Sequence, residues 1–394
     1  MKNILIVFLL LFMFGLTAQQ PYQKGVIIDS LPVNGSDVEL FALYLPKTMK
    51  AGEKAPIVFL FDPQAQGKTA IAHFISSAES HGLIVVCANH IRNGPYEQNF
   101  AKAERLFAHV LSNFSIAENQ IYLAGFSGGS RLATAIAVLT DQMAGVIACG
   151  AGFSQHPMHG PSDQHFSYVG VCGTRDVNLT EMFGVVSYLD TIDFDHTLLT
   201  FEGGHRWPPS EVLHRAFDWL VIRNQDKTGG TLPKTFLETA YSRAQEGIRT
   251  AAKNGLLLQQ ANAYEHTIAT FGPFFQTDSI ADAMGVLKAS KEYKSQKKAR
   301  KTALAKETQL VSTISDRFYQ DYQKPEKARL SWWQKQLDNL NGDALRNTEM
   351  ERMADRIKNR IYIMTIERAR AENPKPSEAQ INLCKNINRL VYAE

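Results

Sequence analysis

Between residues 24 and 223, short apolar runs alternate with longer segments that are apolar on one side only. Two opening runs, at residues 25–28 and 38–45, predict an antiparallel pair of strands. Later runs are apolar throughout and predict strands that are buried on both faces, at residues 57–61, 83–88, 121–124, 145–149, 168–172 and 197–201. Such runs are typical of a mostly parallel sheet.

The segments between these strands have helical periodicity. Residues 99–114 collect their apolar side chains on one face, namely Phe100, Ala103, Leu106, Phe107, Val110 and Leu111. Similar patterns predict helices at residues 131–139, 179–189 and 210–222. Strands that alternate with helices predict an α/β domain over residues 24–223, with helices on both faces of the sheet. Ligand sites in such sheets lie at the carboxyl ends of the strands.

The pattern changes after residue 223. Residues 224–233 include Gly229, Gly230 and Pro233 and predict a linker. Beyond it we expect an all-α domain over residues 234–394, with helices at residues 234–254, 256–270, 279–290, 295–322, 325–339, 348–372 and 377–392. The succession of paired helices resembles tetratricopeptide-like repeats, although the Trp, Leu, Gly and Tyr pattern of those repeats is missing.

Charge divides the chain near the same position. Residues 1–225 carry 14 Lys and Arg against 19 Asp and Glu, a net charge of −5, whereas residues 226–394 carry 28 against 20, a net charge of +8. Much of this excess lies in a basic run from Lys288 to Lys306, which predicts a solvated helix face. The alternative is a surface that attaches to an anionic partner.

The first residues have the pattern of a cleaved signal peptide over residues 1–18: Lys2, an apolar run and a small-residue end at Ala18. No later stretch of the sequence is long and apolar enough for a transmembrane segment. We therefore expect an exported protein, periplasmic or secreted, that meets no nucleic acid. The cysteines lack metal-ligand spacing and predict buried free thiols, at Cys87, Cys149, Cys172 and Cys384.

The strongest chemical signal is Gly125-Phe126-Ser127-Gly128-Gly129, between an apolar strand and a predicted helix. A serine on such a cramped turn requires glycine two positions away on either side, where a larger side chain would collide. The turn holds the hydroxyl outward at the start of the helix, where the Gly128 N–H faces a developing oxyanion. Ser127 is therefore a candidate nucleophile; a small-residue turn for close helix packing is the alternative.

A serine hydroxyl needs a base, and in this arrangement an acid and then a histidine follow the serine along the chain. Asp176 comes soon after the run at residues 168–172, and His205 follows the run at residues 197–201 after two glycines. Both positions lie at strand ends, which favours a carboxylate and a base that meet Ser127. The alternatives are a turn-capping aspartate and an exposed loop histidine.

The loop after residues 57–61 is expected to supply a second oxyanion donor. Pro63 has no N–H, which leaves the backbone N–H groups of Asp62 and Gln64. Tyr96 and Trp207 are expected to bind substrate along the cleft, with packing at the domain surface as the alternative.

The loop at residues 152–165 joins two strands and is short, so we expect a small cap at most and an open cleft. Its three histidines lie in a loop rich in Gly and Pro and do not predict a metal site.

Three motifs resemble the α/β-hydrolase superfamily, and within it the compact esterases of the dienelactone hydrolase and polyhydroxybutyrate depolymerase type: the Ser127 turn, residues 172–176, and Gly203-Gly204-His205. The likeness covers residues 24–223, about half of the chain. It implies a Ser127–His205–Asp176 triad that hydrolyses esters, thioesters or peptide bonds without a cofactor. The usual His-Gly pair of the oxyanion loop is replaced here by Phe61-Asp62.

We therefore expect an exported serine hydrolase that cleaves a small-molecule or polymer-linked ester through an acyl-enzyme. A serine peptidase is the alternative enzyme, because the same triad performs both reactions. From another class, the alternative is an inactive protein of the same fold that binds a protein partner through its helical domain. The presence of Ser, Asp and His in the required order argues against the inactive protein.

Overall fold

The computed structural model describes residues 22–50 and 52–392. The predicted signal peptide lies outside the described residues. The described part of the chain contains an eight-stranded sheet in the order β1-β2-β4-β3-β5-β6-β7-β8. Strand β2 pairs antiparallel with β1 and β4, and the other pairings are parallel, which confirms the predicted mostly parallel sheet. The strands are β1 (Ile27–Pro32), β2 (Leu40–Tyr44), β3 (Ala55–Phe61), β4 (Ile84–Ala88), β5 (Ile116–Phe126), β6 (Gly145–Cys149), β7 (Ser167–Gly173) and β8 (His196–Phe201).

Side chains alternate between two cores, one on each face of the sheet. On β3, Ile57, Phe59 and Phe61 belong to one core, and Val58 and Leu60 belong to the other. This is what a strand buried on both faces requires. The first core is covered by α3 (Tyr96–Asn113), α4 (Gly128–Thr140) and α5 (Leu179–Thr191), and the second by α1 (Gly67–Ala72), α2 (Ile75–His81) and α6 (Ser210–Thr228).

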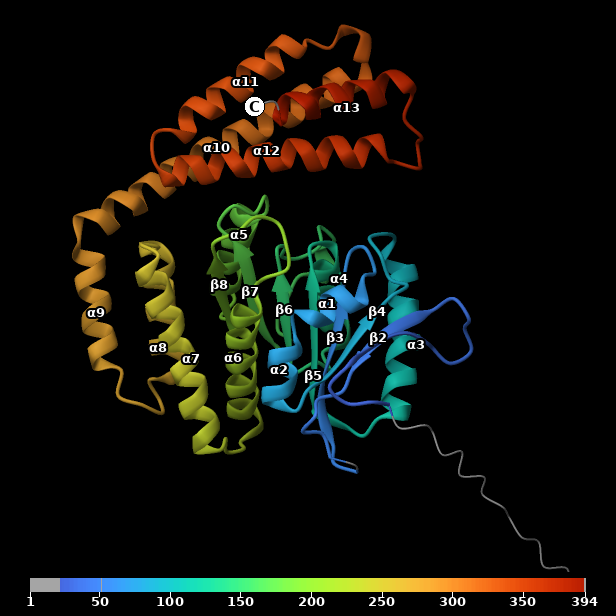
Figure 1. The fold of residues 1–394 in the computed structure, drawn as a ribbon, viewed down its shortest axis with the longest axis vertical. Coiled ribbons are helices and arrows are strands. Elements are labelled where there is room, and N and C mark those ends of the chain that lie inside the picture. The colour runs from blue at the N-terminus through green and yellow to red at the C-terminus, as the bar shows by residue number, and fades with distance from the viewer. Residues whose placement is uncertain (1–21, 51, 393–394) are drawn as a thin grey trace, which may run out of the picture.

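The expected linker at residues 224–233 begins inside a helix, because α6 continues to Thr228. The next helices extend the α/β unit: Ile222 of α6 shares a small core with Ala240 of α7 and Phe271 of α8. Figure 1 shows α7 (Lys234–Lys253), α8 (Leu257–Phe271) and α9 (Asp278–Ala289) beside the β8 edge of the sheet. The change of sequence pattern therefore marks a change of secondary structure and does not mark the edge of a packing unit.

The last four helices form a bundle with its own core. Trp333 is fully buried there, and its indole N–H donates to the Asp321 carboxylate at 2.9 Å. The bundle lies above the carboxyl ends of the parallel strands, with α12 nearest to the sheet (Figure 1). Its members are α10 (Lys291–Gln323), α11 (Leu330–Ala344), α12 (Thr348–Ala369) and α13 (Glu378–Val391). The interpretation as a helical repeat stays a prediction.

Arginines on α12 attach the bundle to the α/β unit. Arg356 is buried, donates to the Thr174 carbonyl at 2.7 Å, and forms an ion pair with Glu307 of α10 at 2.6 Å. Arg352 donates to the Glu202 carboxylate at 2.7 Å. Because Thr174 and Glu202 follow β7 and β8, the bundle is fixed to the two loops that carry Asp176 and His205.

The four cysteines are buried free thiols, as predicted. In residues 22–50 and 52–392, no helix combines the length and the apolar character needed to span a bilayer. The basic run from Lys288 to Lys306 is partly used within the molecule: Lys288 pairs with Glu265 at 2.6 Å, and the Arg300 guanidinium lies 5.4 Å from the centre of the Phe183 ring.

Candidate active site

Ser127 stands on a strained turn between β5 and α4. Its φ of 53° lies in the left-handed region, which a non-glycine residue adopts only at an energetic cost. A Cβ at Gly125 would lie 2.2 Å from the Gly129 carbonyl oxygen, and a Cβ at Gly129 would lie 1.9 Å from the Phe61 carbonyl oxygen. Both glycines are therefore needed for the steric reason expected from the sequence.

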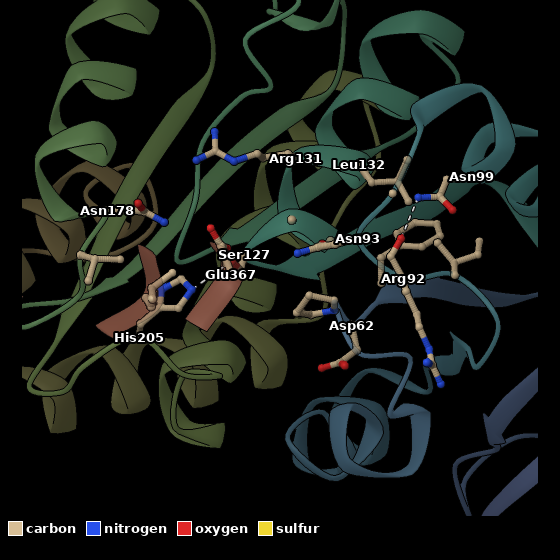
Figure 2. Close-up of a pocket in the computed structure, with 18 of the residues that line it drawn as sticks. Asp62, Arg92, Asn93, Asn99, Ser127, Arg131, Leu132, Asn178, His205 and Glu367 are labelled. Atoms are coloured by element: carbon tan, nitrogen blue, oxygen red, sulfur yellow. Dashed lines mark hydrogen bonds between the residues drawn. The ribbon is translucent and has the colours of Figure 1, made fainter. Parts of the chain in front are cut away.

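The structure brings Ser127, His205 and Asp176 together. Ser127 Oγ lies 2.9 Å from His205 Nε2, and His205 Nδ1 lies 2.9 Å and 3.0 Å from the two carboxylate oxygens of Asp176. A proton on Nδ1 is shared with Asp176, which leaves the Nε2 lone pair to accept the serine hydroxyl. Figure 2 shows the Ser127 and His205 side chains facing each other.

Asp176 is fully buried, and its neighbours hold it in place. Besides His205, its carboxylate accepts the backbone N–H of Asn178 at 2.9 Å. The Asn178 side chain donates in turn to the Gly150 carbonyl at 2.8 Å. Glu181, in the helix that follows this turn, forms an ion pair with Arg131 at 2.7 Å. Asn178 was not predicted, because only the folded chain brings Gly150 beside the Asp176 turn.

The oxyanion loop differs from expectation at Gln64. The Gln64 N–H donates to the Asp62 carboxylate at 2.9 Å, so it is not free for substrate. The other oxygen of Asp62 accepts the Trp207 indole N–H at 2.8 Å. The Asp62 side chain therefore organises this loop. Asp62 and Pro63 both line the pocket above Ser127.

Asn93 contributes an amide that the sequence analysis did not anticipate. A Cβ at Gly128 would lie 1.9 Å from Asn93 Oδ1, so the amide lies directly against the residue that follows Ser127. Figure 2 shows the Asn93 side chain reaching toward Ser127. The Asn93 backbone N–H donates to the Pro63 carbonyl at 3.2 Å, which ties its loop to the end of β3. No motif marks this residue, since its place depends on how the β3 and β4 loops pack.

The two aromatic residues expected to bind substrate have different places. Tyr96 lines the pocket, at the start of α3. Trp207 is only 8% exposed and packs on Phe74 and Phe126. Trp207 does not line the pocket over Ser127: its N–H donates to Asp62 and its rings pack on aromatic neighbours, which favours the packing alternative over substrate binding.

The cleft is covered, contrary to the open cleft expected. A cavity of about 550 Å³ lies over Ser127 and His205, between the strand ends and the bundle. Its roof comes from α10 and α12, more than a hundred residues after the last triad residue, and consists of Ser315, Arg360, Ile363, Met364, Glu367 and Arg368. None of the described residues that line this pocket comes from the loop at residues 152–165, and that loop could not reveal a roof from a distant part of the chain.

One group of potential metal ligands occurs among the described residues: His81, His214 and Asp218. The Asp218 carboxylate accepts two hydrogen bonds from the Arg243 guanidinium, from Nη2 at 2.7 Å and from Nε at 2.8 Å. The arginine therefore supplies the positive charge at this position, which disfavours a cation there. The loop histidines show other contacts: His159 packs on Tyr96 at 4.8 Å.

No protein-family model matches this sequence, and no protein of curated function matches it. Solved structures that it resembles include the fluorophosphonate-binding serine hydrolase FphF of Staphylococcus aureus, with 15% identity, a TM-score of 0.43 and coverage of 50% of this chain and 99% of that one. The S-formylglutathione hydrolase FrmB of Staphylococcus aureus has 16% identity, a TM-score of 0.41 and coverage of 51% and 98%. Est1E from Butyrivibrio proteoclasticus has 12% identity, a TM-score of 0.39 and coverage of 51% and 99%.

The strand order, with β2 antiparallel to both of its neighbours, and the serine turn between β5 and α4 are those of the α/β-hydrolase fold. The likeness to these solved structures extends over about half of the chain. Because the identities and TM-scores are low, we argue the function from the geometry of this chain alone.

Proposed function

We propose that this protein is a serine hydrolase that cleaves carboxylic esters through an acyl-enzyme at Ser127. The observation that carries the proposal is the continuous contact from Ser127 Oγ through the His205 ring to the buried Asp176 carboxylate. A serine on a strained turn, a base within hydrogen-bond reach and a buried carboxylate behind the base are the components of covalent acyl transfer.

The reaction has two halves. Ser127 Oγ attacks the substrate carbonyl carbon while His205 Nε2 takes the hydroxyl proton, and His205 then returns this proton to the leaving alcohol as the acyl-enzyme forms. In the second half, His205 takes a proton from water, the hydroxide attacks the acyl carbon, and the acid leaves as Ser127 regains its proton. Asp176 holds the imidazole tautomer and stabilises the imidazolium in both halves.

The oxyanion that forms in each half needs donors on one side of the carbonyl. The Gly128 N–H at the start of α4 is the first, since it follows the serine and lies at a helix N-terminus. We assign the second to the Asn93 side chain, which lies against Gly128. The Asp62 N–H is the remaining backbone candidate, because Gln64 is engaged.

We place this hydrolase in the periplasm or outside the cell, on the signal-peptide pattern of residues 1–18. Each step uses side chains of this chain and water. The roof over the pocket favours a small-molecule ester or the exposed end of a polymer-linked one.

Labelling with a fluorophosphonate probe tests the proposal. We expect the full chain to label at Ser127 and Ser127→Ala to lose both label and esterase turnover while it keeps its circular dichroism spectrum. Ser76→Ala, on the exposed side of α2, serves as the matched control and should label normally. A folded protein that does not label would favour the alternative of an inactive binding protein.

Comparison of aryl esters with peptide amides separates the esterase from the peptidase. We expect turnover of short-chain p-nitrophenyl esters and slower or absent turnover of p-nitroanilide peptides. Faster cleavage of the amides would assign the same triad to a peptidase.

A further inference from the structure

The pocket over Ser127 has more positive than negative side chains. Among its described lining residues, the arginines outnumber the acids: Arg92, Arg131, Arg360 and Arg368 against Asp62 and Glu367. The Asp62 oxygens are already hydrogen-bonded to Gln64, Gln66 and Trp207. A ligand therefore meets an excess of guanidinium groups.

Arg360 lines the pocket from the roof and is tied to the turn that carries Asp176. It projects from α12, is partly buried, and donates through Nη2 to the Val177 carbonyl at 2.5 Å. Val177 follows Asp176 directly, so the guanidinium is fixed above the turn that carries the acid. Within residues 22–50 and 52–392, Arg360 has no ion pair with a carboxylate. The Val177 carbonyl accepts one of the five N–H donors of the guanidinium and does not neutralise its positive charge.

The other pocket arginines are used differently. Arg131 forms its ion pair with Glu181, and Arg368 lies over the Tyr322 ring with 6.0 Å between the guanidinium and the ring centre. Arg92 is exposed at the pocket rim. In the described part of the chain, Arg360 is thus the partly buried pocket arginine that has no ion pair with a carboxylate.

We propose that the pocket selects esters that carry a carboxylate and that Arg360 binds this carboxylate. This inference rests on the proposed function. A planar guanidinium matches a carboxylate with two parallel hydrogen bonds, and such charge-assisted bonds are strongest where water is excluded. A single fixed guanidinium balances one negative charge, which favours a carboxylate over a doubly charged phosphate. The roof would then determine which esters bind, while the triad at the strand ends performs the reaction.

Two matched pairs of substrates test the inference and locate the charge. For the acyl side, p-nitrophenyl hydrogen adipate is compared with p-nitrophenyl hexanoate; for the alcohol side, 4-acetoxybenzoate is compared with 4-acetoxybenzamide. We expect the wild-type protein to show the higher kcat/KM for the charged member of one pair, and that pair identifies the side on which Arg360 acts.

The Arg360→Gln variant removes the charge and keeps a donor for the Val177 carbonyl. It should lower kcat/KM for the preferred charged ester about 10- to 100-fold, mainly through KM, and leave the neutral ester unchanged. Lys358→Gln, two residues away on α12 and outside the pocket, is the control for general charge loss and should change neither ester.

Two results would overturn the inference: a wild-type preference for the neutral member of both pairs, or an equal loss on charged and neutral esters in Arg360→Gln. Either result leaves the proposed function standing, provided that the neutral esters are cleaved and Ser127 labels. If the folded wild-type protein cleaved none of the four esters and did not label at Ser127, the proposed hydrolase function would instead be rejected.

Discussion

The Asn93 side chain lines the pocket and lies against Gly128, and we propose it as the second oxyanion donor. If its amide stabilises the oxyanion, Asn93→Ala should lower kcat about a hundredfold with little change in KM, because the interaction forms only in the transition state. Steady-state kinetics on a p-nitrophenyl ester measures this split. The affinity for an aryl boronic acid, which mimics the tetrahedral intermediate, should fall with kcat.

The exposed neighbour Gln98 provides the control for Asn93: Gln98→Ala should keep wild-type kinetics. An Asn93→Ala variant with unchanged kcat would return the second donor to the Asp62 N–H.

Gly129 shows how strongly local sterics constrain the turn. In Gly129→Ala, the new methyl group would lie 1.9 Å from the Phe61 carbonyl oxygen, so the end of β3 must move away from the serine. We expect a loss of about 3 kcal/mol or more in the free energy of unfolding, measured by urea denaturation, together with loss of activity.

Gly184 of α5 is the matched control for that substitution, since nothing lies within 4 Å of a Cβ built there. Gly184→Ala should be neutral or stabilising by about 0.5–1 kcal/mol. Equal effects of the two substitutions would contradict a steric role for Gly129.

At the scale of elements, α12 is attached through the buried Arg356–Glu307 ion pair, whose side chains are 2% and 3% exposed. Arg356→Ala would leave Glu307 as an uncompensated buried charge and should destabilise the protein by about 3–5 kcal/mol. Arg249→Ala breaks an exposed pair with Glu246 and should cost at most about 1 kcal/mol.

A second variant separates charge from packing in the α12 attachment. In the double variant Arg356→Met with Glu307→Leu, both charges are replaced by apolar side chains, and much of the lost stability should return. A double variant as unstable as Arg356→Ala would show that the hydrogen bond to the Thr174 carbonyl is the larger contribution.

At the scale of the whole molecule, Glu202 connects three parts of the chain. Its carboxylate accepts from Thr174 of the α/β unit, from Gln259 of α8 and from Arg352 of α12. Burial raises the pKa of Glu202, but Arg352 and Arg175 outweigh burial and hold this pKa below its ordinary value of 4.5. The charged form therefore stabilises the assembled molecule.

The sign of the resulting pH dependence follows from this lowered pKa. The unfolded chain protonates Glu202 near pH 4.5, whereas the folded chain does so only at lower pH, so this stabilisation is complete above pH 4.5 and is lost as the pH falls through the folded pKa. The melting temperature of Glu202→Gln should lie below that of the wild type at pH 7, and the two should converge below pH 4.5. A constant difference down to pH 3 would contradict this reading of Glu202.

The sequence by itself determined the order of strands and helices and the places of Ser127, Asp176 and His205. The spacing of apolar residues indicates which face of each element is buried. Glycines on either side of a serine indicate a tight turn in which larger side chains would collide. These signals act over a few residues, so one sequence suffices to read them.

Only the tertiary structure decided what surrounds the triad. Trp207 is buried and donates its N–H to Asp62, Asn93 meets Gly128 across two loops, and Arg360 reaches Val177 from a helix far along the chain. Each of these contacts joins segments whose own patterns are unremarkable, and only the folded chain brings those segments together. Covering the cleft is therefore a property of the assembled molecule, whereas the reactive turn is a property of its sequence.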